Sequence, residues 1–349
     1  MRRGSRIIAA LLAATLGGGG GAAAQETMPS RVSADTVISA SMLSGASRPG
    51  VMVDATVAVD LGRGLTAIAR PWAWRRPNAT ATFQWYQLQL RYQSRTRVPV
   101  RVDAGIITSP LGLATLQQRA DLNPTISPVP YYVGRLPRIE NTFDDLQMMS
   151  AGYPLGAIVS TSGAWWDLRG GVTDSSPARP RAQLKDDQAP AMTQVIAGGG
   201  ITPRAGLRIG VGLARGGYRK AAAGVPKGVA TVLNLEGEFA INHTRLSGEW
   251  LRDQFTSPVS SHVARAFYLQ AVQTITPRLF GAARISRIDP PVLFPDGSDT
   301  DRRIAELTAG YRLTREWTLR GGYLRERDYL SSTWDNQAAV SIVWAKRWY

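Results

Sequence analysis

The stretch that decides the fold lies near the carboxyl end and reads IAELTAGYRLTREWTLRGGY, from Ile304 to Tyr323. Its first half alternates between an apolar face, with Leu307 and Tyr311, and a polar face that includes Glu306. A second run of similar pattern begins after the tripeptide TRE. Alternation with a period of two predicts β-strands with one apolar and one polar face. Each run has about 9–11 residues, the length that a tilted strand needs to cross a bilayer.

Two earlier stretches repeat this arrangement of run, turn and run. The tetrapeptide ITPR occupies residues 201–204 and again residues 275–278, and an alternating run follows each copy. Another clear alternation covers Leu233 to Ile241. A soluble β-sandwich would share the period, but aromatic residues near strand ends, such as Tyr311 and Trp317, are typical of a membrane interface. A closed barrel also has no sheet edge to protect, so the pattern favours a barrel in lipid.

The predicted fold is all-β, a single transmembrane antiparallel β-barrel of about sixteen strands, with fourteen as the alternative. An even number places both chain ends and the short turns on one rim, and the longer loops on the other; in bacterial barrels these are the periplasmic and extracellular rims. We expect strands at residues 33–43, 51–60, 65–76, 80–92, 98–108, 144–154, 163–174, 192–202, 205–218, 229–241, 244–255, 263–275, 278–288, 302–313, 316–328 and 335–347.

The first 24 residues have the pattern of a secretory signal peptide. Three arginines precede an apolar run of about ten residues, and Ala22 to Ala24 offers a cleavage site of the A-x-A type. Residues 25–349 are then the mature barrel. No later segment has eighteen consecutive apolar residues, so no transmembrane helix is predicted.

The composition limits the chemistry and the partners. The formal net charge is +15, or +12 without the three arginines of the signal segment, and there is no cysteine. Disulfides and thiol chemistry are therefore excluded. Nucleic acid is a poor partner for an exported chain. Anionic lipid phosphates outside the barrel, or anionic solutes inside it, fit the positive charge better.

One predicted connection is much longer than the others. Residues 109–143 follow the fifth predicted strand, contain several prolines, and form a structureless stretch of the kind that is often functional. With the sixteen predicted strands and the aromatic end Trp348-Tyr349, the chain resembles the Gram-negative outer-membrane porins. The phrase GIITSPLG, residues 105–112, is similar to a strand-end phrase of the phosphate- and carbohydrate-selective porins. In similar porins this loop folds into the barrel, so the resemblance implies that residues 109–143 narrow a channel.

Charged side chains on the inward strand faces would line such a channel and tune its selectivity. The pore-lining candidates are Arg91, Arg101, Asp103, Asp167, Arg169, Arg208, Glu236, Glu238, Arg245, Glu306, Arg312 and Arg320. The constriction-loop candidates are Arg119, Asp121, Arg135, Arg138 and Glu140. Arg101 and Asp103 are two residues apart, as are Asp167 and Arg169, so wall ion pairs are an alternative role for them.

These observations predict a porin: a water-filled channel in the outer membrane of a Gram-negative bacterium, reached through the Sec pathway. Small hydrophilic solutes would cross it by passive diffusion, and the net charge favours anions. The expected partners are those solutes, outer-membrane lipid and lipopolysaccharide, and the outer-membrane assembly machinery. Trimers are common among similar porins. We expect no enzymatic activity, no cofactor, no metal and no nucleic acid partner.

Two other classes of protein stay open as alternatives. A barrel hydrolase would need a catalytic constellation, and the chain has only His243 and His262. Ser261 is adjacent to His262, and neighbouring residues on a strand point to opposite faces, so the two make a poor Ser–His pair. Two separate histidines without cysteine also give no metal-ligand set. The other alternative is a receptor or scaffold barrel that does not conduct.

Overall fold

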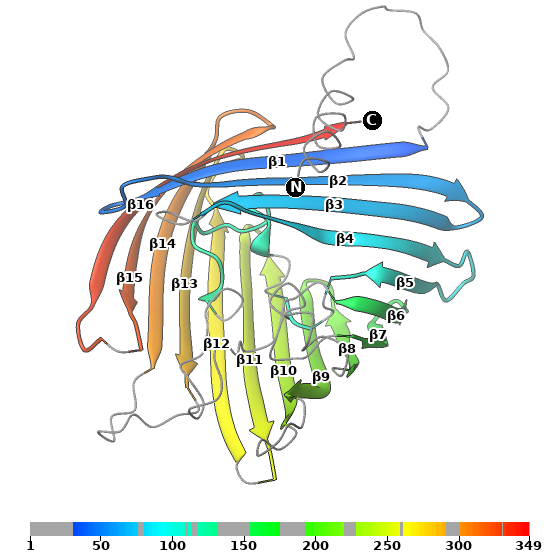
Figure 1. Ribbon diagram of the computed structural model, residues 1–349. Helices are drawn as coiled ribbons and strands as arrows, with labels where there is room; N and C mark the ends of the chain where they lie inside the picture. Colours follow the sequence, from blue (N-terminus) through cyan, green and yellow to red (C-terminus); the bar gives the residue numbers. More distant parts are fainter. Residues whose placement is uncertain are drawn as a thin grey trace, which may run out of the picture. The chain divides into compact units, whose positions relative to one another are not determined.

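The chain forms a closed antiparallel β-barrel (Figure 1). The computed structural model describes residues 31–75, 80–108, 111–113, 117–130, 154–174, 193–219, 228–258, 261–290, 301–329 and 331–348. Within these residues sixteen strands each pair with their neighbours in sequence, and β1 (Val32–Leu43) pairs with β16 (Asp335–Trp348). The predicted all-β barrel and its sixteen strands are confirmed.

The other strands lie where the alternating runs predict them, with one exception that is described below. They are β2 (Gly50–Gly62), β3 (Leu65–Arg75), β4 (Thr82–Gln93), β5 (Val100–Ile106), β6 (Leu155–Ser162), β7 (Trp166–Thr173), β8 (Gln194–Arg204), β9 (Leu207–Arg219), β10 (Gly228–Ile241), β11 (Thr244–Thr256), β12 (Ser261–Thr274), β13 (Leu279–Asp289), β14 (Arg302–Arg312) and β15 (Trp317–Arg327). No helix among the described residues is long and apolar enough to cross a membrane.

The pairing of β1 with β16 closes the sheet. The register runs without interruption from Ala34 opposite Trp348 to Leu43 opposite Ala339. Each edge strand therefore meets a partner, and its backbone N–H and C=O groups are hydrogen-bonded. Lipid offers no alternative partners, so this closure is the condition for an antiparallel sheet to span a bilayer.

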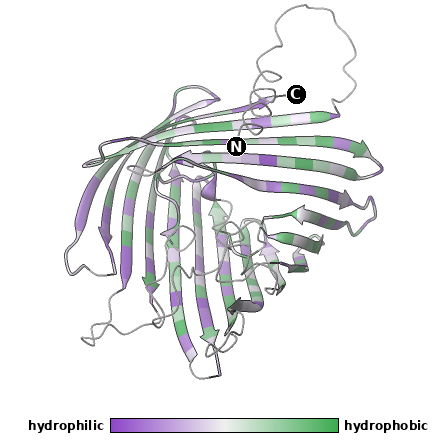
Figure 2. Ribbon diagram, viewed as in Figure 1, coloured by the Kyte–Doolittle hydropathy of each residue, from purple (hydrophilic) through white to green (hydrophobic). Residues whose placement is uncertain are grey.

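The two faces of each strand differ in chemistry, as the alternating colours of Figure 2 show. Outward residues such as Leu235 and Leu307 are large, apolar and exposed, at 46% and 62% of their surface. The residues next to them, Asn234 and Glu306, are polar and buried inside the barrel. A barrel with an apolar exterior and a polar interior is the arrangement that lipid outside and water inside require.

Short turns and long connections lie on opposite rims. Two-residue turns such as Asn242-His243 join β10 to β11, and four residues or fewer join β12 to β13 and β14 to β15. The turn before β9 places Gly206 at a φ of 83°, with the carbonyl oxygen of Ala240 where a Cβ would be. Glycine is therefore required there, because a side chain would strain the backbone and collide with β10.

The sixth strand lies outside its predicted range. We predicted residues 144–154, whereas β6 is Leu155–Ser162. The strand starts directly after Pro154, a position where the missing N–H does no harm. Its exposed Leu155 and Val159 alternate with Gly156 and the buried apolar Ile158, so both faces lack a clear polar pattern and the alternation is weak in the sequence. Residues 144–153 and the predicted signal peptide, residues 1–24, lie outside the described residues, and the signal peptide stays a prediction.

The outward placement of Leu235 can be tested directly. Replacing it with arginine should impair insertion by roughly 2–4 kcal/mol if it faces the bilayer midplane. The measurement is the urea midpoint of folding into lipid vesicles, read from the heat-modifiable band on a gel. Leu235→Val is the control and should fold like the wild type. A Leu235→Arg variant that assembles normally would show that this face of β10 does not meet lipid.

Candidate functional site

The connection between β5 and β6 contacts the inner wall of the barrel. We call its described residues, 111–113 and 117–130, the lumen segment. Leu111 and Val129 are buried, at 0% and 1% exposure. The side-chain amide of Gln117 donates to the hydroxyl of Tyr268 on β12 at 3.2 Å, and Arg119 pairs with Asp35 on β1 at 2.8 Å. Because Tyr268 is buried and inward, the segment lies within the barrel.

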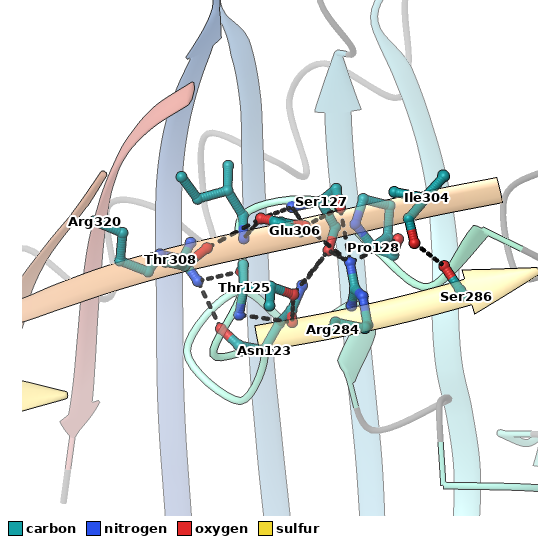
Figure 3. Close-up of polar contacts among 11 residues, drawn as sticks. Asn123, Thr125, Ser127, Pro128, Arg284, Ser286, Ile304, Glu306, Thr308 and Arg320 are labelled. Carbon is teal, nitrogen blue, oxygen red and sulfur yellow. Dashed lines mark hydrogen bonds and ion pairs between the residues drawn. The ribbon is translucent and has the colours of Figure 1, made fainter. Parts of the chain in front are cut away.

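The firmest attachment is to β13 and β14 (Figure 3). The carboxylate of Glu306 accepts hydrogen bonds from the backbone N–H groups of Ile126, at 2.6 Å, and Ser127, at 3.2 Å. It also accepts the hydroxyl of Ser127. Arg284 donates to the Ser127 carbonyl at 2.5 Å and pairs with Glu306 at 3.2 Å. The two charged side chains are 1% and 2% exposed, so this ion pair is shielded from solvent.

Arg320 on β15 makes a second attachment. One of its terminal nitrogens donates to the carbonyl oxygens of Asn123, Thr125 and Ala120, at 2.6, 2.9 and 3.2 Å. The other donates to the hydroxyl of Ser341 on β16 at 3.0 Å. A guanidinium carries several donors in a rigid fork, which suits a cluster of backbone carbonyls. Carbonyl oxygens that would otherwise lack partners inside the barrel are thereby satisfied.

Opposite these attachments lies a cavity of about 620 Å³ between the lumen segment and the wall from β3 to β10. Six arginines line it: Arg70, Arg91, Arg101, Arg119, Arg169 and Arg208. The carboxylates in its lining are Asp103, Asp167 and Glu238.

The arginines are held by carboxylates on the same strand or on nearby strands. Arg91 and Arg101 both bind Asp103, at 2.7 and 2.8 Å. Arg208 bridges Asp167, at 3.0 Å, and Glu236, at 2.6 Å. Each of these groups takes its position from strand alternation and register, so the network is fixed by the sheet itself.

In these ion pairs the carboxylates are more deeply buried than the arginines. The side chains of Asp54, Asp103 and Glu236 are only 1%, 7% and 0% exposed. Their arginine partners range from 13% for Arg70 to 46% for Arg101. The guanidinium groups are thus the more exposed members of these pairs and line the cavity.

Arg119 brings a positive charge from the lumen segment to the same cavity. Burial alone would lower its pKa, but its hydrogen bond to Asp121 and the charges of Asp121 and Asp35 leave the pKa above its ordinary value. The bond to Asp121 is 2.8 Å long. Arg119 is therefore charged at every physiological pH.

The remaining predicted site residues are distributed more widely. Arg169 pairs with Glu236 at 3.1 Å, and Asp167 pairs with Arg208 at 3.0 Å. These two pairs take the place of the Asp167–Arg169 pair that the sequence offered as an alternative. Arg245 and Glu238 lie 3.9 Å apart and are both exposed. Arg312 donates to the Pro277 carbonyl at 2.9 Å, at the rim of short turns. Arg135, Arg138 and Glu140 lie outside the described residues.

Two groups were missed by the sequence analysis. Arg284 lies on the polar face of β13, one residue before the exposed Ile285, so alternation was the signal that could have found it. An inward aromatic cluster on β3 and β4 was also missed. The ring of Trp72 lies 5.2 Å from Trp74 and 4.9 Å from Tyr86, and Arg70 lies 4.4 Å above the Tyr86 ring.

No family model matches the chain, and no characterised protein matches it by sequence. Solved structures do share its fold. An anion-selective porin from Comamonas acidovorans is 13% identical with a TM-score of 0.60, and the match covers 90% of this chain and 99% of that one. OmpF of Salmonella typhi, solved with daunomycin, is 10% identical with a TM-score of 0.60, covering 90% and 97%. OmpT of Vibrio cholerae, solved in a trimer form, is 10% identical with a TM-score of 0.52, covering 90% and 98%.

At such low identity the likeness shows the fold alone. The chain has the fold of the Gram-negative outer-membrane porins, a closed transmembrane barrel of sixteen antiparallel strands.

The attachment of the lumen segment can be tested with a double-mutant cycle. Arg284→Met and Glu306→Gln should each lower the free energy of unfolding by roughly 3–5 kcal/mol, because each leaves a buried charge without its partner. The double variant should recover part of that loss. The measurement is urea unfolding of the refolded protein in detergent, followed by tryptophan fluorescence. Losses that simply add would show that the two side chains are not coupled.

Proposed function

We propose that the chain forms a water-filled channel of the outer membrane through which small hydrophilic solutes diffuse passively, with a mild preference for anions. One observation carries the proposal: the lumen segment is bound to one side of the inner wall, and an arginine-lined cavity of about 620 Å³ lies on its other side. The porin fold supports the same reading, since barrels of this strand number enclose an aqueous channel.

Residues 109–143 are proposed to be the constriction loop. Its described part is bound by Glu306 and Arg320 on β14 and β15 and by Asp35 on β1. These contacts hold the backbone on one side of the interior, so solutes would pass between the segment and the wall from β3 to β10.

The preference for anions rests on how the charges are layered. Arginine heads face the cavity, while several of their carboxylate partners are covered by them. A passing anion would meet guanidinium donors before it meets carboxylates, and rings of such charges set selectivity in pores. Asp167 and Glu238 are partly exposed, at 31% and 36%, and keep the preference mild.

Export and assembly belong to the same proposal. We propose that residues 1–24 direct Sec export and that the outer-membrane assembly machinery inserts the barrel. The trimer form of OmpT from Vibrio cholerae supports a homotrimer for this chain as well.

The proposal is tested by planar-bilayer recording of the refolded mature protein. We expect stepwise openings and a reversal potential of the anion-selective sign under a salt gradient. Replacing Arg101 and Arg169 with glutamine should shift the reversal potential toward cation selectivity, because both guanidinium groups line the cavity. The matched control replaces Arg97 and Arg278, which lie in exposed turns at the rim of short turns, with glutamine. This variant should keep the sign of the wild-type reversal potential. A folded barrel that never conducts would refute the channel.

The role of the loop is tested by removing residues 115–138. If these residues narrow the conduction path, the single-channel conductance should rise, because ionic current grows with the open cross-section. The heat-modifiable band on a gel checks that the shortened barrel has folded. An unchanged conductance in a folded variant would place the segment outside the path of the ions.

A further inference from the structure

A row of arginines stands on the outer surface of one half of the barrel. Each lies within four residues of a strand end at the rim of the long connections. We call them the arginine belt: Arg215 on β9, Arg252 on β11, Arg265 on β12, Arg287 on β13, Arg303 on β14, and Arg325 and Arg327 on β15.

Strand register brings most of the belt together on the neighbouring strands β11 to β15, while β10, with Thr231 opposite Arg215 and Leu233 opposite Arg252, separates Arg215 from the rest. Arg303 is paired directly with Arg287 on one side and with Arg327 on the other. Arg252 is paired directly with Arg265. Residues that pair across antiparallel strands share a face of the sheet, so these side chains stand next to one another.

The belt borders the apolar outer surface. Arg215 lies two residues beyond Leu213, and Arg287 lies two residues beyond Ile285, so each pair shares the outward face. Those two apolar side chains are 48% and 50% exposed. Tyr323, two residues before Arg325, is 48% exposed. The lipid-facing surface of these strands therefore ends in guanidinium groups, at the level where a bilayer passes from acyl chains to headgroups.

Most of the positive charge of the belt is not neutralised by the protein. Arg287, Arg303 and Arg327 share the carboxylate of Asp301, and Arg287 also binds Asp289 at 2.6 Å. Within the described residues, Arg215, Arg252 and Arg265 have neither an ion pair nor a side-chain hydrogen bond. Seven arginines thus face two carboxylates, and like charges this close repel one another unless an anion comes between them.

The rest of the circumference provides a contrast. Near the same rim, the outward residues of β2, β4, β6, β7 and β8 include Val53, Phe83, Leu155, Val172 and Val195, all exposed and apolar. Arg75, at the same rim of β3, is also on the outward face, opposite Val51, but it donates to the Pro49 carbonyl at 3.3 Å. The basic residues are therefore concentrated over β9 to β15, and a uniformly basic surface does not explain them.

We propose that the arginine belt binds the phosphate groups of anionic lipid in the outer leaflet, the chemistry that lipopolysaccharide presents. Acyl chains would pack on Leu213, Ile285 and their neighbours, while the phosphates lie level with the arginines. Guanidinium groups bind phosphate through paired N–H donors, and their aliphatic stems tolerate the apolar border. Basic residues at an anionic membrane surface attract such headgroups. The site faces lipid, so it is independent of whether the barrel conducts.

The test uses the refolded full chain in neutral detergent and a fluorescent lipid A that carries both phosphates. Arg215, Arg252 and Arg265 are replaced together with glutamine, because they have no partner in the described protein to lose. The matched control replaces Arg97, Arg278 and Arg315, three exposed arginines on the short-turn rim, and removes the same charge. Heat modifiability and channel conductance are recorded for both variants and should match the wild type, which separates this test from that of the channel.

We expect the belt variant to bind lipid A on the order of 100-fold more weakly, at about 1 kcal/mol for each arginine near the surface. The control variant should stay within about twofold of the wild type, since its arginines lie at the other rim. Dephosphorylated lipid A should bind the wild type as weakly as lipid A binds the belt variant. Millimolar inorganic phosphate should not compete, because it lacks acyl chains. Equal affinity of the belt variant and the wild type, or equal losses in both variants, would overturn the proposal.

Discussion

The structure depends on one constraint: a sheet that meets lipid must leave no backbone hydrogen-bonding group unsatisfied. The uninterrupted register between β1 and β16 meets that constraint by removing both edges. Once the sheet is closed, every strand has one side toward lipid and one toward the interior, and a period of two decides which residue goes where. The outward Leu235 and inward Glu236 follow from that rule without any further contact.

The constraint has a consequence for the interior. The inward faces of sixteen strands concentrate charged and amide side chains in a space where each needs a partner. The barrel supplies these partners in two ways. Arginines and carboxylates on nearby strands bind one another: Arg208 on β9 binds Glu236 on the adjacent β10 and, across β8, Asp167 on β7. On the opposite side the partner is backbone, since the lumen segment offers its N–H groups to Glu306 and its carbonyls to Arg320. The segment and the wall thus complete each other.

Much of the fold could be predicted from the sequence because alternation and parity are local properties. The strand count, the rim of short turns and the outward face of β10 all follow from runs of about ten residues. The sixth strand was misplaced because Leu155–Ser162 is short and rich in small residues, so its alternation carried little signal. The attachments of the lumen segment could not be predicted. Alternation puts Glu306 and Arg320 inside, but it cannot show which inward residues a segment 180 positions away will cover.

Strand parity also changes what the net charge of this chain means. Arg208 and Arg303 are the same residue type on strands of the same barrel, yet one points inward and binds carboxylates while the other points outward at the rim. Part of the formal charge of +15 therefore never reaches the interior. The inner network is close to balanced once buried acids such as Glu236 are counted. A preference for anions would then come from position, with guanidinium groups in front and carboxylates behind. Much of the excess charge lies elsewhere, on the outer surface with Arg215 and Arg265 and on the short-turn rim with Arg278.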